Sequence, residues 1–139
     1  MANGGPYIAF AAFCERVLEE KDGGISLIRL IDRITAVRPA VLFGNEMPPV
    51  THPVWLAIAL KPGMARGRHS LVIEIDKPSA QRAKLFEGAV LFEGEDRGVS
   101  VLLNLQGYVF ELEGLYWFDV LLGETLLTRI PIRITYQPV

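Results

Sequence analysis

The feature that most constrains the fold is an alternation of apolar and polar side chains with a period of two residues. It is clearest in HSLVIEID, residues 69–76, where Leu71, Ile73 and Ile75 alternate with a mostly polar set. Because successive side chains of a β-strand point to opposite faces of a sheet, this pattern predicts a half-buried strand. The other extended segments predicted in this way are 6–18, 25–37, 51–61, 88–93, 99–108, 115–122 and 126–136.

Clusters of turn-forming residues separate these segments, at 21–24, 44–49, 61–67 and 94–98. The number and spacing of the segments predict an all-β fold, an antiparallel β-sandwich of roughly seven to nine strands that is immunoglobulin-like or C2-like. The one helical candidate is the segment 79–86, which begins with serine, a favourable N-cap, and continues with good helix formers. We expect one or two helical turns there.

Composition narrows the class of protein. The chain has 139 residues, the usual length of one domain, and shows no repeat or linker, so we expect a single domain over 1–139. Half of its residues (50%) are hydrophobic and its mean hydropathy is +0.29, which favours self-association. A net charge of -2 provides no broad positive field. We therefore expect no nucleic-acid or membrane partner.

The longest apolar run, Tyr7 to Cys14, is a strand candidate rather than a targeting segment. It is too short to span a bilayer, and no Lys or Arg precedes it as in a signal peptide. The bulky Phe13 before the cysteine argues against a lipoprotein site. A single cysteine cannot form an internal disulfide and is compatible with a reducing compartment. We expect a cytoplasmic protein.

Two predicted strands, 7–14 and 115–122, are apolar on both faces. A two-layer sandwich covers one face of each strand, so the other must meet a loop, a helix or another subunit. This indicates a non-catalytic module that forms a homo-oligomer or binds a protein partner. The candidate contact residues are Phe10, Trp55, Trp117 and Leu121.

The closing segment, 114–134, is predicted to be a hairpin. Alternation sends Tyr116 and Phe118 to the core and Trp117 outward. A glycine two residues before Tyr116 matches the corner tyrosine of sandwiches, whose hydroxyl bonds to the backbone a few residues upstream, and Phe118 takes the place of the cysteine in antibody domains.

Turn chemistry and burial disagree about the register of this hairpin. A two-residue turn at Gly123 and Glu124 would set Phe118 opposite Arg129, whereas the burial pattern sets it opposite Ile130. We give the burial pattern more weight and expect a three-residue loop or a bulge. This register pairs Tyr116 with Ile132, Trp117 with Pro131 and Asp119 with Arg129.

Pro131 cannot donate to a ladder, which indicates that the last strand is an edge or is bulged at that point.

Side chains that could carry chemistry are scattered. His52 and His69 lie in separate turn regions without the spacing of metal ligands, and Cys14 lacks the positive setting that activates a thiol. No nucleophile elbow and no phosphate-binding glycine loop is present. Glu93, Glu95 and Asp96 form one acidic turn without the second acidic loop of a calcium site. We therefore expect no catalytic residue, no metal and no cofactor.

A basic loop at 61–69 offers an alternative function. It carries Lys61, Arg66, Arg68 and His69, and its two glycines would let the backbone approach a phosphate. No aromatic residues alternate with the basic ones, as they do in proteins that bind single-stranded nucleic acid, so a solvated hairpin tip is favoured. The alternative is a small-molecule or phosphate-binding protein that uses this loop.

Two stretches, 13–36 and 114–134, resemble an uncharacterised family of small bacterial proteins that is known only as a domain of unknown function. The matching features are a first strand ending in Cys-Glu-Arg, a D-G turn, a strand ending in Asp-Arg-Ile and a closing G-x-Y-x-F hairpin. The resemblance covers nearly the full length. It implies a β-sandwich and carries no activity to transfer.

The same motifs suggest a polar network between the first two strands. Glu15 and Arg16, or Asp32 and Arg33, would form its cross-strand ion pairs.

Overall fold

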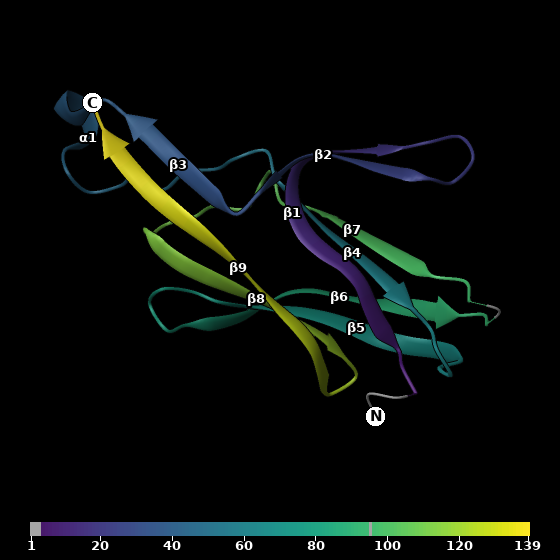
Figure 1. The fold of residues 1–139 in the computed structure, drawn as a ribbon. Coiled ribbons are helices and arrows are strands. Elements are labelled where there is room, and N and C mark those ends of the chain that lie inside the picture. Colours follow the sequence, from purple (N-terminus) through teal and green to yellow (C-terminus); the bar gives the residue numbers. More distant parts are fainter. Residues whose placement is uncertain (1–3, 95) are drawn as a thin grey trace.

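The chain folds into β-strands joined by turns and by two longer loops, 39–54 and 105–113, as a computed structural model of the protein shows for residues 4–94 and 96–139 (Figure 1). One small helix, α1 (Ala40–Phe43), accompanies them. The strands are β1 (Tyr7–Glu19), β2 (Ile25–Ile31), β3 (Arg33–Arg38), β4 (Trp55–Lys61), β5 (Gly67–Asp76), β6 (Arg82–Phe92), β7 (Val99–Asn104), β8 (Gly114–Leu122) and β9 (Thr125–Pro138).

These strands form two sheets. Sheet A has four strands in the order β2-β1-β4-β7, and sheet B has five in the order β3-β9-β8-β5-β6. All neighbours are antiparallel except β3 and β9, which run parallel. In immunoglobulin terms β4 and β7 correspond to strands B and E, and β5, β8 and β9 to C, F and G. The prediction of an all-β sandwich is confirmed, and of its two alternatives, immunoglobulin-like and C2-like, the fold is the immunoglobulin-like one.

The core lies between the inner faces of the two sheets. The ring of Phe13 in β1 meets that of Phe118 in β8 edge to face, with ring centroids 5.0 Å apart. Alternation places every second residue of the central strands in this layer, as predicted for β5. The largest fully buried side chains are Phe13, Phe92, Phe110, Phe118, Leu56, Ile58, Leu60, Leu71, Ile73, Ile75, Ile132 and Ile134.

The β8–β9 hairpin satisfies both turn chemistry and burial. Leu122 pairs with Thr125 around a two-residue turn, in which Gly123 has φ +59°. Leu127 is then an extra residue in β9, and beyond this bulge Phe118 lies opposite Ile130. The predicted bulge and the register that follows from it are confirmed.

Tyr116 is a corner tyrosine, as predicted. Its hydroxyl donates to the carbonyl oxygen of Leu112 at 2.8 Å and accepts from the backbone N–H of the same residue at 3.1 Å. The ring is buried, and it contacts Phe110 edge to face. This contact fixes the start of β8 against the loop that precedes it.

Pro131 occupies a stretch of β9 that is locally an edge. It lies opposite Trp117 of β8, and the pairing of β9 with β3 begins two residues later, at Arg133. The missing N–H of the proline therefore costs no ladder bond to β3, which agrees with the prediction.

The predicted helix at 79–86 is wrong. Residues 77–81 form a tight turn, with the backbone N–H of Lys77 donating to Gln81 and that of Ala80 donating to Lys77. Strand β6 begins at Arg82, opposite Asp76 of β5. Such a short segment is a marginal helix by itself, and pairing with β5 along its whole length outweighs its local propensity.

The predicted segment 25–37 divides into two strands. β2 ends at Ile31 in sheet A, and β3 begins at Arg33 in sheet B. The carbonyl oxygen of Asp32 accepts a hydrogen bond from the backbone N–H of Arg133 at 3.1 Å. The chain therefore crosses from one layer to the other at Asp32, in the middle of an apparently continuous apolar pattern.

Strand β1 is long enough to serve two neighbours in turn. It pairs with β4 from Tyr7 to Cys14 and with β2 from Phe13 to Glu19. The second half of β1 and β2 together form a two-stranded projection, residues 15–31, that we call the arm. In Figure 1 the arm runs back along the upper right of the molecule, on the side of β4 and β7.

Candidate functional site

The four candidate contact residues lie on opposite sides of the sandwich. Phe10 in β1 and Trp55 in β4 belong to sheet A, whereas Trp117 and Leu121 are in β8 of sheet B. Phe10 is 38% exposed, and the other three side chains are partly buried. A single contact surface cannot include all four.

An apolar groove lies between the arm and sheet A. It has a volume of about 220 Å³, and all of its lining residues except a serine are apolar. They are Phe10, Ile25, Leu27, Ala57, Ile58, Ala59, Ser100 and Leu102. Since β1, β2, β4 and β7 all contribute, the groove depends on the arm and on the sheet together.

Further large apolar side chains are exposed on the arm, and the β1–β2 register places Leu18 and Ile28 on the face opposite to the groove-lining Leu27. Leu18, Ile25 and Ile28 are exposed, and Leu30 is 59% exposed. In the described structure no strand pairs with the outer side of β2, so the arm ends sheet A there. Exposed apolar side chains gathered in this way are typical of an interaction site.

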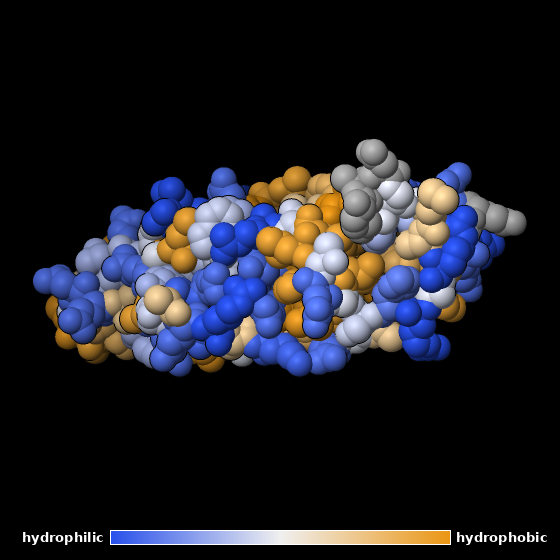
Figure 2. Space-filling view, turned by 90° about the horizontal axis from the view of Figure 1, so that it is seen from below, coloured by the Kyte–Doolittle hydropathy of each residue, from blue (hydrophilic) through white to orange (hydrophobic). Residues whose placement is uncertain are grey.

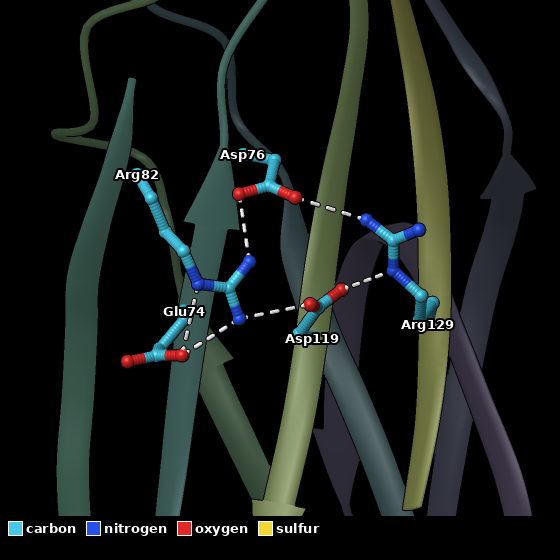
Figure 3. A network of polar contacts seen from close by, with 5 residues as sticks. All are labelled: Glu74, Asp76, Arg82, Asp119 and Arg129. Carbon is cyan, nitrogen blue, oxygen red and sulfur yellow. Dashed lines mark hydrogen bonds and ion pairs between the residues drawn. The ribbon is translucent and has the colours of Figure 1, made fainter. Parts of the chain in front are cut away.

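The opposite side of the molecule carries a network of charged side chains (Figure 3). Its centre is Asp119 of β8, which is 5% exposed. One carboxylate oxygen accepts from Arg129 of β9 at 2.7 Å, and the other accepts from Arg82 of β6 at 2.9 Å. A carboxylate this deeply buried needs such partners, because burial without them is costly.

Two further carboxylates of β5 complete the network. Arg82 bonds to Glu74 at 2.6 Å and to Asp76 at 2.7 Å, and Arg129 bonds to Asp76 at 3.0 Å. The pKa of Arg82 is raised by its hydrogen bonds to Asp76, Glu74 and Asp119. Every carboxylate of this set is bound to a guanidinium, so the network ties β6, β5, β8 and β9 together.

Trp117 is covered by the same network. The guanidinium carbon of Arg129 lies 4.7 Å from the centre of the indole ring, within the range of a cation–π contact. Trp117 therefore already has a role in holding the hairpin together, which weakens the case for it as a free contact residue.

Leu121 belongs to a separate apolar row next to the network. It pairs with Val72 of β5 on one side and Leu126 of β9 on the other. Figure 2 looks at the molecule from below Figure 1, on the side of β5, β6 and the β8–β9 turn, and shows hydrophobic residues gathered between hydrophilic ones. Leu121 stays a predicted contact residue.

The basic side chains of the loop 61–69 do not converge on one site. Arg66 donates to the carbonyl oxygens of Gly63 at 2.8 Å and Ala65 at 2.7 Å, so its guanidinium holds the loop itself. His69 contacts the Arg66 carbonyl at 3.0 Å and packs against Phe92. Lys61 is in sheet A, whereas Arg68 and His69 are in sheet B.

A shallow cavity beside this loop has a mixed charge. It is lined by Arg68, His69, Ser70, Glu87, Gly88 and Ala89. The negative charge of Glu87 disfavours the binding of an anion in this cavity. Lys84 donates a hydrogen bond to the Glu87 carboxylate, and this bond lowers the pKa of Glu87.

The predicted polar network between the first two strands is wrong in its partners. Glu15 forms its ion pair with Arg29 of β2, and His52 lies 3.8 Å from the same carboxylate. Arg16 faces Ile28 across the ladder, and Arg33 belongs to the other sheet. The break at Asp32 is the reason, because it removes the end of the predicted second strand from sheet A.

The remaining candidates for chemistry are dispersed. Cys14 is fully buried, and burial raises the pKa of its thiol. Glu93 lies 3.5 Å from Arg97, and Glu95, the middle member of the predicted acidic turn, lies outside the described residues. Over 4–94 and 96–139, no group of three His, Cys, Asp or Glu side chains is arranged to hold a metal ion.

Sequence reasoning missed Glu74, Asp76 and Arg82 as parts of a site. The alternation in β5 does put both carboxylates on one face, and that was the available signal. Arg82 was hidden because it fell within the wrongly predicted helix. Ile25 and Leu27 of the groove were missed because the arm could not be foreseen.

Solved structures share this fold at low sequence identity. A β-glucosidase from Listeria innocua in complex with gluconolactone matches with a TM-score of 0.52 and 10% identity, over 94% of this chain and 17% of the glucosidase. A second structure of the Listeria innocua β-glucosidase matches with a TM-score of 0.50 and 11% identity, over 78% of this chain and 15% of the glucosidase. This chain thus spans less than a fifth of the glucosidase, and the likeness concerns the fold alone.

An immunoglobulin-like protein from Pseudomonas aeruginosa matches over 96% of this chain and 99% of its own length, with 13% identity and a TM-score of 0.45. The comparison with curated proteins found no match. In the described part of the chain, no helix has the length and apolar character needed to cross a membrane.

A family comparison agrees with the resemblance seen in the sequence. Residues 9–135, from β1 to β9, match the family of unknown function DUF6941. The match includes the arm, the corner tyrosine and the closing hairpin. The chain therefore belongs to DUF6941, a family of unknown function.

Proposed function

We propose that this protein is a non-catalytic β-sandwich module that binds a protein chain on the groove side of sheet A. The observation that carries the proposal is the apolar groove, with Phe10 at its side and exposed apolar residues along the adjoining arm. Burying such a surface is favourable by about 25 cal/mol per Å². A partner chain is the occupant that would bury both the groove and the arm.

The side chains of this surface support binding rather than chemistry. The groove is lined by aliphatic and aromatic residues and one serine, with no charged group. The buried thiol of Cys14 and the paired carboxylates of the network are not presented to a substrate. A cytoplasmic location is part of the proposal and rests on the sequence.

The alternative, an anion site at the basic loop, has less support. Arg66 bonds to carbonyl oxygens of its own loop, and Glu87 lines the cavity next to Arg68. A thermal-shift titration with inorganic phosphate tests it. Saturation at a hundred times the dissociation constant would stabilise the fold by about 2.7 kcal/mol, and this gain should disappear in Arg68→Gln.

The groove is tested through self-association, the simplest form of binding to a protein chain. Light scattering coupled to size-exclusion chromatography, over a range of protein concentrations, gives the mass of the wild type and of Phe10→Asp. We expect the charge at position 10 to shift the mass towards the monomer, because it cannot be buried in an apolar contact.

Leu91→Asp is the matched control. Leu91 is also a large exposed apolar residue, on β6 of sheet B and outside the groove lining. It should retain the wild-type mass. A folded Phe10→Asp variant with the same concentration-dependent mass as the wild type would contradict the proposal.

A further inference from the structure

One side of β7 has no hydrogen-bonded strand beside it in the described structure. β7 is the last strand of sheet A and pairs with β4. Among the described residues, its other side makes no backbone hydrogen bond. In immunoglobulin constant domains strand D lies at this position, next to strand E. The backbone groups of this edge are therefore available to another strand.

This edge also lacks the charged residues, prolines and bulges that commonly keep edge strands from pairing with another strand. β6 carries Arg82, Lys84 and Glu87, and β3 begins and ends with arginine. The sequence of β7, VSVLLN, has no charged residue and no proline, and its register with β4 is regular. Natural edge strands are commonly blocked by charges, prolines or bulges.

The ladder with β4 determines which groups point outward. The backbone N–H of Leu105 donates to Val54 at 2.9 Å, which extends the β4–β7 ladder by one hydrogen-bonded pair. Bonding alternates along an antiparallel ladder. Hence Ser100, Leu102 and Asn104 direct their N–H and C=O groups towards the free side.

We propose that a second copy of this chain occupies this edge, with its β7 antiparallel to the first and Leu102 at the two-fold axis. Leu102 then lies opposite the partner's Leu102, Val101 opposite the partner's Leu103, and Ser100 opposite the partner's Asn104. Two four-stranded sheets A join into one continuous sheet of eight strands. This inference rests on the proposed function and names its partner.

The self-complementarity of β7 favours a second copy over an unrelated strand. In this register apolar residues face apolar ones, the two polar residues face each other, and no like charges meet. A shift by one residue would set outward backbone groups against groups already bonded to β4. Leu102 also lines the groove, so the paired edge is continuous with the proposed binding surface.

The inner face of β7 gains cover in the same assembly. Val99, Val101 and Leu103 pack against the core but stay partly exposed at the open side of the sandwich. An added strand would shield them from water. Sheet A would then no longer end at β7, because the partner's β7 would continue it.

A cysteine at the axis tests this register. Hydrogen-bonded antiparallel partners have Cα atoms about 5.5 Å apart, within the disulfide range of about 4.4–6.8 Å. In a Cys14→Ala background, Leu102→Cys should form a disulfide-linked dimer under mild oxidation, seen on a non-reducing gel. Ser100→Cys is the control, because its two copies would be about 13 Å apart along the strands. Equal dimer yields, or no dimer at position 102, would overturn the inference.

Blocking the edge provides a second test that leaves the β4 ladder intact. Ser100→Pro removes one outward N–H, a change that edge strands tolerate. We expect its dimer dissociation constant to rise at least tenfold, with Ser100→Ala unchanged and circular dichroism confirming that both variants are folded.

The two proposals fail in different ways. If Phe10→Asp weakens self-association but Ser100→Pro does not, the groove is the binding surface and the β7 edge is not. If Ser100→Pro weakens it and Phe10→Asp does not, the edge is correct and the groove is wrong. A wild type that stays monomeric at every concentration overturns the inference of a β7 dimer.

Discussion

The network on sheet B and the groove on sheet A lie on opposite sides of one sandwich and meet solvent in different ways. In the network, Asp119, Glu74 and Asp76 bond to two arginines that arch over the sheet. In the groove, Phe10 and Leu27 border a space of about 220 Å³ that no described side chain fills. The network is completed within the chain, whereas the groove is left open.

The difference shows that the outward apolar residues of a strand that is apolar on both faces can be covered within the chain or can stay exposed. On β8 the outward Trp117 is covered by an arginine of the next strand. On β1 the outward Phe10 has the arm beside it and remains 38% exposed. Only the second arrangement leaves apolar surface for another molecule.

Among the substitutions that test this difference, removal of the Asp119 carboxylate should reduce the free energy of unfolding most. Asp119→Ala removes the more buried of the two carboxylates that Arg82 and Arg129 share, and leaves them Asp76. Breaking a buried pair costs about 3–5 kcal/mol, and because both arginines are partly exposed we expect a loss of about 2–3 kcal/mol in the free energy of unfolding. Urea denaturation measures it. A loss no larger than that of Glu74→Ala, at the margin of the network, would show that Asp119 is not its centre.

A smaller effect is expected from Trp117→Ala. The cation–π contact with Arg129 is worth about 0.5–1 kcal/mol at a partly exposed site, and lost ring contacts add to it, so the free energy of unfolding should fall by about 1 kcal/mol. The mass measured by light scattering should not change. A shift towards the monomer would place Trp117 in the binding surface and remove the distinction between the two faces.

Chemical modification of the Cys14 thiol should have the smallest effect of the three tests, because the native protein is measured without a substitution. It lies where β1 passes from sheet A into the arm, and burial both covers it and raises its pKa. Because the thiolate is the reactive form, we expect a disulfide reagent to modify it far more slowly in the native protein than in urea. The cysteine of a Leu91→Cys variant, at an exposed position of β6, is the reference. Rapid modification of native Cys14 would mean that the arm opens readily.

The elements that the sequence predicted well are those determined by neighbours along the chain. The hairpin register followed from the burial pattern of β8 and β9, and Leu127 reconciles it with the turn at Gly123. The corner tyrosine followed from a spacing of two residues, and its hydroxyl partner, Leu112, is four residues away.

The elements that it missed depend on distant partners. Arg82 reaches Asp119, 37 positions further along the chain, and it does so because β6 pairs with β5 where local propensity favoured a helix. The break at Asp32 has no turn signal, and it follows from the pairing of β3 with β9. The groove was not predictable for the same reason, since it depends on where the arm lies.

The parallel pairing of β3 with β9 has a consequence for the order in which the protein can fold. Arg33 pairs with Arg133 and Arg38 with Pro138, so β3 bonds to a strand that follows all the other described strands. During synthesis, every strand between β3 and β9 must be produced before this partner exists. Sheet A can pair as soon as β7 has emerged, while sheet B is completed only after β8 and β9 have followed.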